Sequence, residues 1–291
     1  MNCAKEPDLK DLVESALKED AADNDITTDC LVPKKSRAEA FFLAKEDLII
    51  CGLGISCLAF RQLDKNIKFK QYFSDGNSVK KGQVIATISG NARAILAAER
   101  VALNFLCLLS GIATKTKKYV FAVKPYKAKI LDTRKSIPGL RMLEKYAVRC
   151  GGGFNHRMAL DEMLLVKDNH KQVLGGRFWL SGKKHLENIP KKLAIEIEVD
   201  DLSEFKKALG IGPDIIMLDN MSVQEIKSAV KIRNNLSPNA KHPIPKLEAS
   251  GGIKLANIRR VASTGVDFIS IGNLTSSVES VDISLEINEE I

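Results

Sequence analysis

The chain is poor in the residues on which several kinds of protein depend. Aromatic residues make up only 5% of its 291 residues, and only one Trp is present. Proteins that bind single-stranded nucleic acid stack bases on aromatic side chains beside basic grooves, so this composition disfavours nucleic acid as a partner. There are only four His, and no two of the six Cys form a C-x-x-C pair. Neither a zinc site nor a disulfide framework is therefore predicted, and we expect reduced thiols in the cytoplasm.

Long hydrophobic runs are missing as well. The longest apolar stretch, Leu48–Phe60, has 13 residues and contains Gly52 and Gly54, whereas a bilayer-spanning helix needs about 20 apolar residues. Residues Met1–Asp8 lack the basic and then apolar layout of a secretory signal. We therefore expect no membrane-spanning segment.

Basic residues outnumber acidic ones. The 44 Lys and Arg exceed the 36 Asp and Glu by 8, which gives a formal net charge of +8. Such a charge suits either nucleic acid or a small polyanionic substrate, so the positions of the basic residues must decide. The local basic runs at 115–118, 183–184 and 191–192 are interpreted as solvated surface.

The hydrophobic pattern divides the chain near residue 115. Before it, a short helix at 8–20 precedes strand-like runs, and helical spacing of apolar residues extends from 92 to 111. The strand-like runs lie at 38–44, 48–51, 67–73 and 84–88. Residues 1–115 are therefore predicted to form a small domain of mixed helices and strands.

After residue 115, a short apolar strand, a polar strand end and an amphipathic helix follow one another repeatedly. The expected strands are at 129–131, 163–166, 193–199, 214–218, 245–249 and 267–271. Such alternation indicates parallel βαβ units. Six units favour an incomplete barrel at 116–279, although they would also suit an open doubly wound sheet. In both architectures the polar strand ends lie at the carboxyl edge of the sheet, where the sites of α/β proteins are found.

Both signs of charge are present at that edge. The cations are Arg134, Lys135, His156, Arg157 and Lys167, and the acids are Asp132, Glu198 and Asp219. Glu196 and Glu198 are two residues apart, so they share one face of their strand. Because an unpaired inward carboxylate is costly, these acids suggest a cationic partner or a metal. A structural salt-bridge network inside the barrel is the alternative interpretation.

Two glycine loops follow the last two expected strands. Ser250-Gly251-Gly252 and Gly272-Asn273 each come between an apolar strand and a helix. Exposed backbone N–H groups and a helix N-terminus favour a bound anion, and barrels often bind phosphate at this place. Ordinary turns would have the same composition. Taken together, the residues suggest a polyanionic substrate and a hard cation such as Mg2+.

The chain resembles the quinolinate phosphoribosyltransferase family through motifs that occur in family order over nearly its whole length. These motifs are Asp25–Thr28, Glu99–Leu106, Leu109–Thr114, Asp132–Lys135, Gly151–Arg157, Val166–His170, Glu196–Val199, Leu218–Asn220, Glu248–Gly252 and Thr264–Asp267.

The resemblance implies a pentosyltransferase. Such an enzyme transfers the phosphoribosyl group of PRPP to quinolinate with loss of CO2, forming nicotinate mononucleotide and pyrophosphate for de novo NAD synthesis. It also implies an N-terminal α/β sandwich, an open α/β barrel, Mg2+ as cofactor, and a homodimer or a larger assembly such as a hexamer. The tail at about 280–291 is expected to pack with the first domain.

The resemblance also assigns roles to individual residues. Arg134, His156, Arg157 and Lys167 would contact the two quinolinate carboxylates, and Arg100 would enter the neighbouring subunit's site. Lys135 would contact a phosphate or the pyrophosphate, and Thr133 would be a further substrate-binding residue. Glu198 and Asp219 would face Mg2+–PRPP and the ribose, and Lys135, Lys167, Glu198 and Asp219 would be catalytic. The 5′-phosphate loops would be formed by Ser250, Gly251, Gly252 and Gly272.

Some positions depart from the family pattern, namely Asn24, Met158-Ala159 and Ser276, and a short insertion is expected at 237–245. None of these removes a charged site residue. Two alternatives remain at this stage. One is nicotinate phosphoribosyltransferase, which uses a monocarboxylate, and the other is a non-catalytic relative that binds polyanions.

Overall fold

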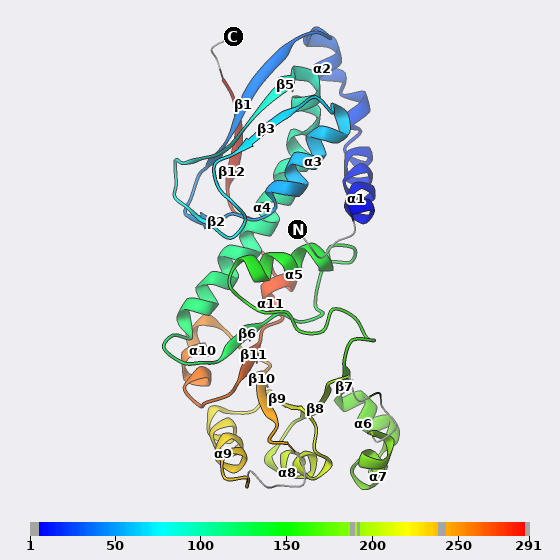
Figure 1. Cartoon of the computed structure of the whole chain (residues 1–291), viewed down its shortest axis with the longest axis vertical. Helices are drawn as coiled ribbons and strands as arrows, with labels where there is room; N and C mark the ends of the chain where they lie inside the picture. Colours follow the sequence, from blue (N-terminus) through cyan, green and yellow to red (C-terminus); the bar gives the residue numbers. More distant parts are fainter. Residues whose placement is uncertain (1–5, 187–189, 191–192, 238–242, 289–291) are drawn as a thin grey trace. The chain divides into compact units, whose positions relative to one another are not determined.

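The computed structural model describes residues 6–186, 190, 193–237 and 243–288. The chain forms two compact units (Figure 1). The first contains residues up to Lys117, Ile137–Gly152 and Leu274 onward, and the second contains Lys118–Ser136 and Gly153–Asn273. The sequence-based division placed 137–152 and 274–279 in the barrel domain, whereas the structure groups both segments with the first unit. Most of the expected insertion at 237–245 lies outside the described residues.

An antiparallel sheet forms the centre of the first unit, with strand order β12–β1–β5–β3. Its strands are β1 (Arg37–Ala44), β3 (Lys68–Gln71), β5 (Val84–Asn91) and β12 (Ile283–Ile287), and the small pair β2 (Leu48–Ile49) and β4 (Ser78–Val79) lies apart from it. Alternate residues of β1 are buried, as a sheet with one covered face requires. Strand β12 pairs with β1 from Ala40↔Ile287 to Ala44↔Ile283, so the C-terminal segment completes this sheet.

The first unit contains the helices α1 (Glu6–Glu19), α2 (Ile26–Leu31), α3 (Leu53–Leu63) and α5 (Arg141–Cys150), the 3-10 helix η1 (Ala22–Asn24), and most of α4 (Ala92–Ala122). Helix α11 (Asn273–Ser276) begins at the border of this unit. Rings of Phe42, Phe60 and Phe69 pack with centroids 5.9–6.5 Å apart, which joins α3 to the sheet. Helix α5 belongs here because the Tyr146 hydroxyl donates to Asp75 Oδ2 at 2.8 Å.

Helix α4 is longer than the helix predicted at 92–111. It begins where Asn91 Oδ1 accepts the backbone N–H groups of Arg93 and Ala94, at 3.0 and 3.3 Å. By length and composition it could cross a membrane, but 61% of its most apolar window is buried inside the protein. Burial of this kind is typical of a core helix, which meets the same criteria.

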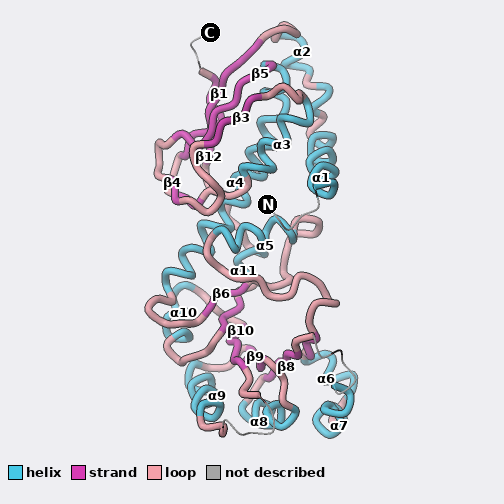
Figure 2. Tube along the Cα trace, in the orientation of Figure 1, coloured by secondary structure: helices cyan, strands magenta, loops and turns pink. Residues whose placement is uncertain are grey.

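The second unit is built on a parallel sheet of six strands, in the order β6–β11–β10–β9–β8–β7. Figure 2 shows strands of this sheet in magenta and the neighbouring helices in cyan. The strands are β6 (Lys129–Leu131), β7 (Leu164–Val166), β8 (Ile195–Val199), β9 (Ile215–Asp219), β10 (Lys246–Ser250) and β11 (Phe268–Ser270). Within the described residues the edge strands β6 and β7 do not pair with each other, so the barrel is open. This confirms the predicted fold class.

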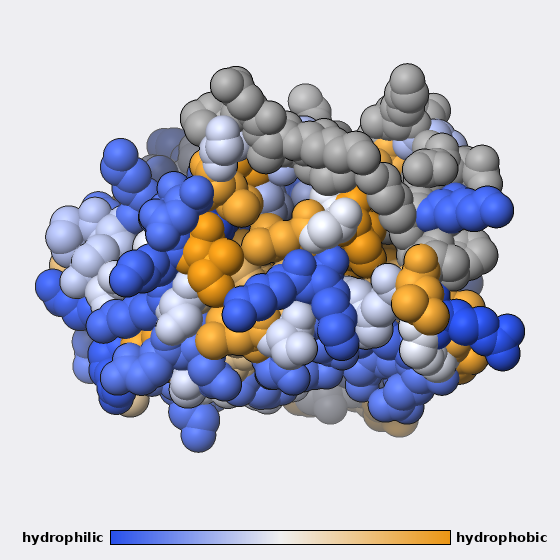
Figure 3. Space-filling model, turned by 90° about the horizontal axis from the view of Figure 1, so that it is seen from below, coloured by the Kyte–Doolittle hydropathy of each residue, from blue (hydrophilic) through white to orange (hydrophobic). Residues whose placement is uncertain are grey.

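Helices alternate with these strands: α6 (Asp168–Leu174), α7 (Arg177–Leu186), α8 (Leu202–Ile211), α9 (Val223–Asn234) and α10 (Leu255–Ala262). Side chains fix two of their N-termini, because Asp201 and Ser222 accept the backbone N–H groups of Glu204 and Glu225. In the view from below, hydrophobic residues are visible toward the middle of the face, with hydrophilic residues beside and below them (Figure 3).

Candidate active site

The carboxyl ends of the central strands bring predicted site residues to one edge of the sheet. Ser250 at the end of β10 is in register with Asp219 at the end of β9, and Val199 of β8 is in register with Leu218. Glu198 is in register with Met217, two residues before Asp219, so it lies in the last part of β8, near the same edge. The parallel arrangement therefore assembles residues that are far apart in the sequence.

Residues 153–157 lie against the outer edge of β6. Phe154 forms a parallel bridge with Leu131, and its backbone N–H donates to Ile130 O at 2.8 Å. The fully buried carboxylate of Asp132 then accepts the backbone N–H of His156 at 2.9 Å and the side-chain amide of Asn155. Asp132 thus fixes the segment that carries His156 and Arg157.

Both ring nitrogens of His156 are engaged. Nδ1 accepts the backbone N–H of Arg157 at 2.8 Å, and Nε2 lies 2.9 Å from Glu196 Oε2. Glu196, one of the two acids of β8, is fully buried, and His156 is its partner inside the barrel.

Two guanidinium groups share this region. Burial and the nearby charge of Arg134 both lower the pKa of Arg157, whereas Glu196 opposes the shift. Arg157 Nη1 donates to Met163 O at 2.8 Å, but the buried Nε atoms of Arg134 and Arg157 have no hydrogen-bond partner in the described part of the chain. Two neighbouring guanidinium groups with N–H donors left to use can bind an anion that has more than one acceptor oxygen.

Lys135, Thr133 and Gly272 also lie together. The Thr133 hydroxyl accepts the Lys135 backbone N–H at 3.1 Å. A Cβ at Gly272 would be 2.9 Å from Lys135 Cδ and 3.6 Å from Thr133 Oγ1, so the lysine stem passes directly over this glycine. The end of β11 therefore meets the Asp132–Lys135 motif at the end of β6.

Acids and a lysine meet at the ends of β7, β8 and β9. Lys167 Nζ lies 3.6 Å from Glu198 Oε2. Burial raises the pKa of Glu198, Lys167 counteracts this, and the negative charge of Asp219 adds to it. Oxygen atoms of Glu198, Asp219 and Asp200 lie within 4.8 Å of one another, and three carboxylates at this spacing are suitable ligands for a hard cation such as Mg2+.

The first glycine loop has the strained geometry that only glycine accepts readily. Gly251 and Gly252 have φ values of +82° and +62°. A Cβ at Gly251 would be 2.3 Å from Asn220 Oδ1, whereas nothing lies within 4 Å of a Cβ at Gly252. The backbone of this loop is therefore packed on one side against the end of β9 and open on the other.

Arg100 is the one predicted site residue that belongs to the first unit, where it lies exposed on α4. The other predicted residues all belong to the second unit.

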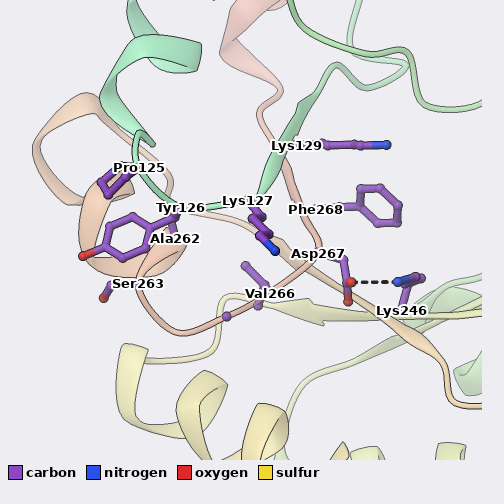
Figure 4. Close-up of a pocket in the computed structure, with 11 residues that line it drawn as sticks. Pro125, Tyr126, Lys127, Lys129, Lys246, Ala262, Ser263, Val266, Asp267 and Phe268 are labelled. Carbon is purple, nitrogen blue, oxygen red and sulfur yellow. Dashed lines mark hydrogen bonds and ion pairs between the residues drawn. The ribbon is translucent and has the colours of Figure 1, made fainter. Parts of the chain in front are cut away.

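A separate cavity of about 520 Å³ lies at the opposite, amino-terminal edge of the sheet (Figure 4). Lys127, Lys129, Tyr126 and Phe268 line it, and Lys246 Nζ is paired with Asp267 Oδ1 at 3.1 Å. None of the predicted site residues lines this cavity. This cavity is therefore distinct from the candidate site at the carboxyl edge.

Sequence reasoning missed two acids at the site. Glu248 lies in β10 between Leu247 and Ala249, and it is fully buried. A charged residue inside an apolar strand was the signal that could have identified it. Asp200 joins Glu198 and Asp219 only because β8 and β9 are neighbours, which the sequence does not reveal.

Known proteins share both the sequence and the fold. Residues 25–110 match the model of the quinolinate phosphoribosyl transferase N-terminal domain, and residues 112–286 match that of its C-terminal domain. A probable nicotinate-nucleotide pyrophosphorylase (carboxylating) of Synechocystis sp. is 42% identical over 86% of this chain and 83% of its own length.

Two further relatives cover nearly the whole chain. Quinolinate phosphoribosyltransferase (decarboxylating) 2b, mitochondrial, of Nicotiana tabacum is 39% identical over 98% of this chain and 83% of its own. The structure of the nicotinate-nucleotide pyrophosphorylase from Francisella tularensis is 40% identical, covers 99% of this chain and 98% of its own, and superposes with a TM-score of 0.88. The chain therefore belongs to the quinolinate phosphoribosyl transferase family.

Proposed function

We propose that this protein is a pentosyltransferase that transfers the phosphoribosyl group of PRPP to quinolinate. The products are nicotinate mononucleotide, pyrophosphate and CO2, and the reaction belongs to de novo NAD synthesis. The observation that carries the proposal is the pair of Arg134 and Arg157, two neighbouring cations with unpartnered buried donors. A dicarboxylate supplies the acceptors that these groups need, and a monocarboxylate such as nicotinate supplies fewer.

Lys135 and the glycine loops are assigned to PRPP. Backbone N–H groups around Ser250, Gly251, Gly252 and Gly272 would hold the 5′-phosphate, and Lys135, with Thr133 beside it, would contact the pyrophosphate. Glu198 and Asp219, with Asp200 beside them, would hold Mg2+ directly or through water. The ion neutralises charge on the pyrophosphate.

Catalysis then rests on placement and charge. The quinolinate nitrogen forms a bond to C1′ of the ribose as the bond from C1′ to the pyrophosphate oxygen breaks. The carboxylates of Glu198 and Asp219 stabilise the positive charge that develops at C1′, while Lys135 and Lys167 stabilise negative charge on the substrates. The ring nitrogen is then cationic, so it stabilises the electron pair that remains on ring carbon C2 when the 2-carboxylate departs as CO2, and C2 takes up a proton from water. No general base is required.

Substitution of Gly251 tests the phosphate loop. Gly251→Ala adds a Cβ that must displace Asn220, so we expect the KM for PRPP to rise about tenfold or more. Gly139→Ala is the matched control, because Gly139 has the same φ of +82° but nothing within 4 Å of its Cβ position. Steady-state kinetics with both variants measure the difference. Equal KM values for PRPP would contradict the assignment.

The substrate assignment is tested with purified protein, PRPP and Mg2+, with ring-labelled quinolinate and ring-labelled nicotinate in parallel. We expect mononucleotide from quinolinate alone, with one CO2 released per nucleotide. Product from nicotinate alone would support the first alternative. No product from either, together with a salt-sensitive shift of DNA or RNA, would support a non-catalytic polyanion-binding protein.

The working unit is proposed to be a homodimer, or a larger assembly built from dimers, in which Arg100 enters the partner's site. The five cysteines that the structure describes are all free, which supports a reducing compartment, and we propose the cytoplasm.

A further inference from the structure

Two buried acids lie beneath the candidate site and have no role in the assignments above. Glu196 of β8 and Glu248 of β10 are both fully buried. Their oxygens and a ring nitrogen of His156 lie within 4.8 Å of one another. His156 Nε2 is 2.9 Å from Glu196 Oε2 and 3.8 Å from Glu248 Oε2. The imidazole therefore lies above a pair of carboxyl groups from two strands that are not neighbours in the sheet.

The hydrogen bonds of the ring fix its tautomer. Nδ1 accepts the backbone N–H of Arg157, so it carries no hydrogen. The hydrogen of a neutral imidazole must then be on Nε2, which donates to Glu196. A doubly protonated ring would direct a second N–H against the N–H of Arg157. The geometry thus favours a neutral His156 held between Glu196 and Arg157.

The carboxyl group of Glu248 belongs to the same cluster. Burial, followed by the charge of Glu196, raises the pKa of Glu248 to about 8, so Glu248 retains a proton at neutral pH. Lys167 and the Ser270 hydroxyl face the same carboxyl group and partly oppose the shift, and a positive charge on His156 would oppose it as well.

We propose that Glu196, with Glu248 beside it, is a positioning residue for Arg157 and acts through the imidazole of His156. Glu196 holds Nε2–H, and Nδ1 in turn holds the Arg157 backbone N–H beside the quinolinate pocket. His156 is then a positioning residue as well. The proposal rests on the proposed function, in which Arg157 binds quinolinate.

Kinetics of Glu196 variants test the proposal. Glu196→Ala removes the acceptor, so we expect the KM for quinolinate to rise about tenfold while the KM for PRPP stays within about twofold. Glu196→Gln keeps an oxygen that can accept from Nε2–H, and it should restore most of the affinity for quinolinate. Exposed Glu39 on β1 provides the control Glu39→Ala, with unchanged kinetics. Equal rises in both KM values, or a Gln variant no better than Ala, would overturn the proposal.

Nitrogen-15 NMR of imidazole-labelled protein gives a readout that needs neither turnover nor a folded variant of Glu196. The chain has only four His, and comparison with His156→Gln identifies the signal of His156. We expect a neutral ring with its hydrogen on Nε2 at pH 7.5. A doubly protonated ring, or a hydrogen on Nδ1, refutes the positioning arrangement even in an active enzyme. Failure of the quinolinate assay with the expected tautomer present would instead refute the proposed function.

Discussion

Arg100→Ala and Lys167→Ala proteins should each be inactive alone, and their mixture should recover about a quarter of the wild-type activity. Random exchange makes about half of the dimers mixed, and each mixed dimer has one site with both residues intact. Recovery is expected because Arg100 is proposed to act in the partner's site, whereas Lys167 acts in the site of its own subunit. The measurement is mononucleotide formation after the two proteins are unfolded and refolded together.

A mixture of Arg157→Ala and Lys167→Ala proteins is the matched control. Both residues belong to the second unit, so every site of a mixed dimer retains one defect, and no recovery is expected. Activity in the Arg100→Ala protein alone, or silence in its mixture with Lys167→Ala, would contradict the shared site.

Glu248→Gln should stabilise the protein in alkali. The pKa of Glu248 is about 8 in the folded protein, against a value of 4.5 for an ordinary glutamic acid. The folded state therefore binds this proton more tightly, and the free energy of unfolding falls as the pH rises from about 4.5 to about 8. Gln has no proton to lose, so the variant should exceed wild type by roughly 2–4 kcal/mol at pH 9, with little difference at pH 5.

Urea unfolding at pH 5, 7 and 9 measures this difference directly. Titrating groups distant from Glu248 contribute equally to both proteins, so the gap between the two curves reports Glu248 and the groups that interact with it. The exposed Glu39→Gln variant should instead follow wild type at every pH. Parallel curves for the Glu248→Gln and wild-type proteins would show that the buried carboxyl group is not held protonated.

Much of the second unit was predictable because its local pattern and its tertiary packing agree. Six apolar strands with polar ends indicated an open barrel, and the observed sheet has six parallel strands. The first unit was harder to predict from the sequence. In the apolar run Leu48–Phe60 a strand was predicted at 48–51, where β2 lies, but the first turns of α3 in the same run were not predicted. A short apolar run fits a strand or a buried helix equally well, so periodicity alone could not separate them.

The segment at 137–152 illustrates the same limit at the level of domains. Its helix was predicted from amphipathic spacing, and α5 confirms it. Which unit it joins depends on the hydrogen bond of Tyr146 to Asp75, a residue 71 positions away. Spacing along the chain carries no information about such a contact.

By itself, the sequence determined the composition of the site: the basic Asp132–Lys135 and His156-Arg157 motifs, the acids of β8 and β9, and the glycines that follow β10 and β11. Strand periodicity also placed Glu196 and Glu198 on one face. Only the tertiary structure decided that Glu248 lies beside Glu196 and that both ring nitrogens of His156 are occupied. The reason is physical: protonation and tautomer depend on burial and on neighbours from other strands, and the order of strands in a sheet is fixed by packing rather than by distance along the chain.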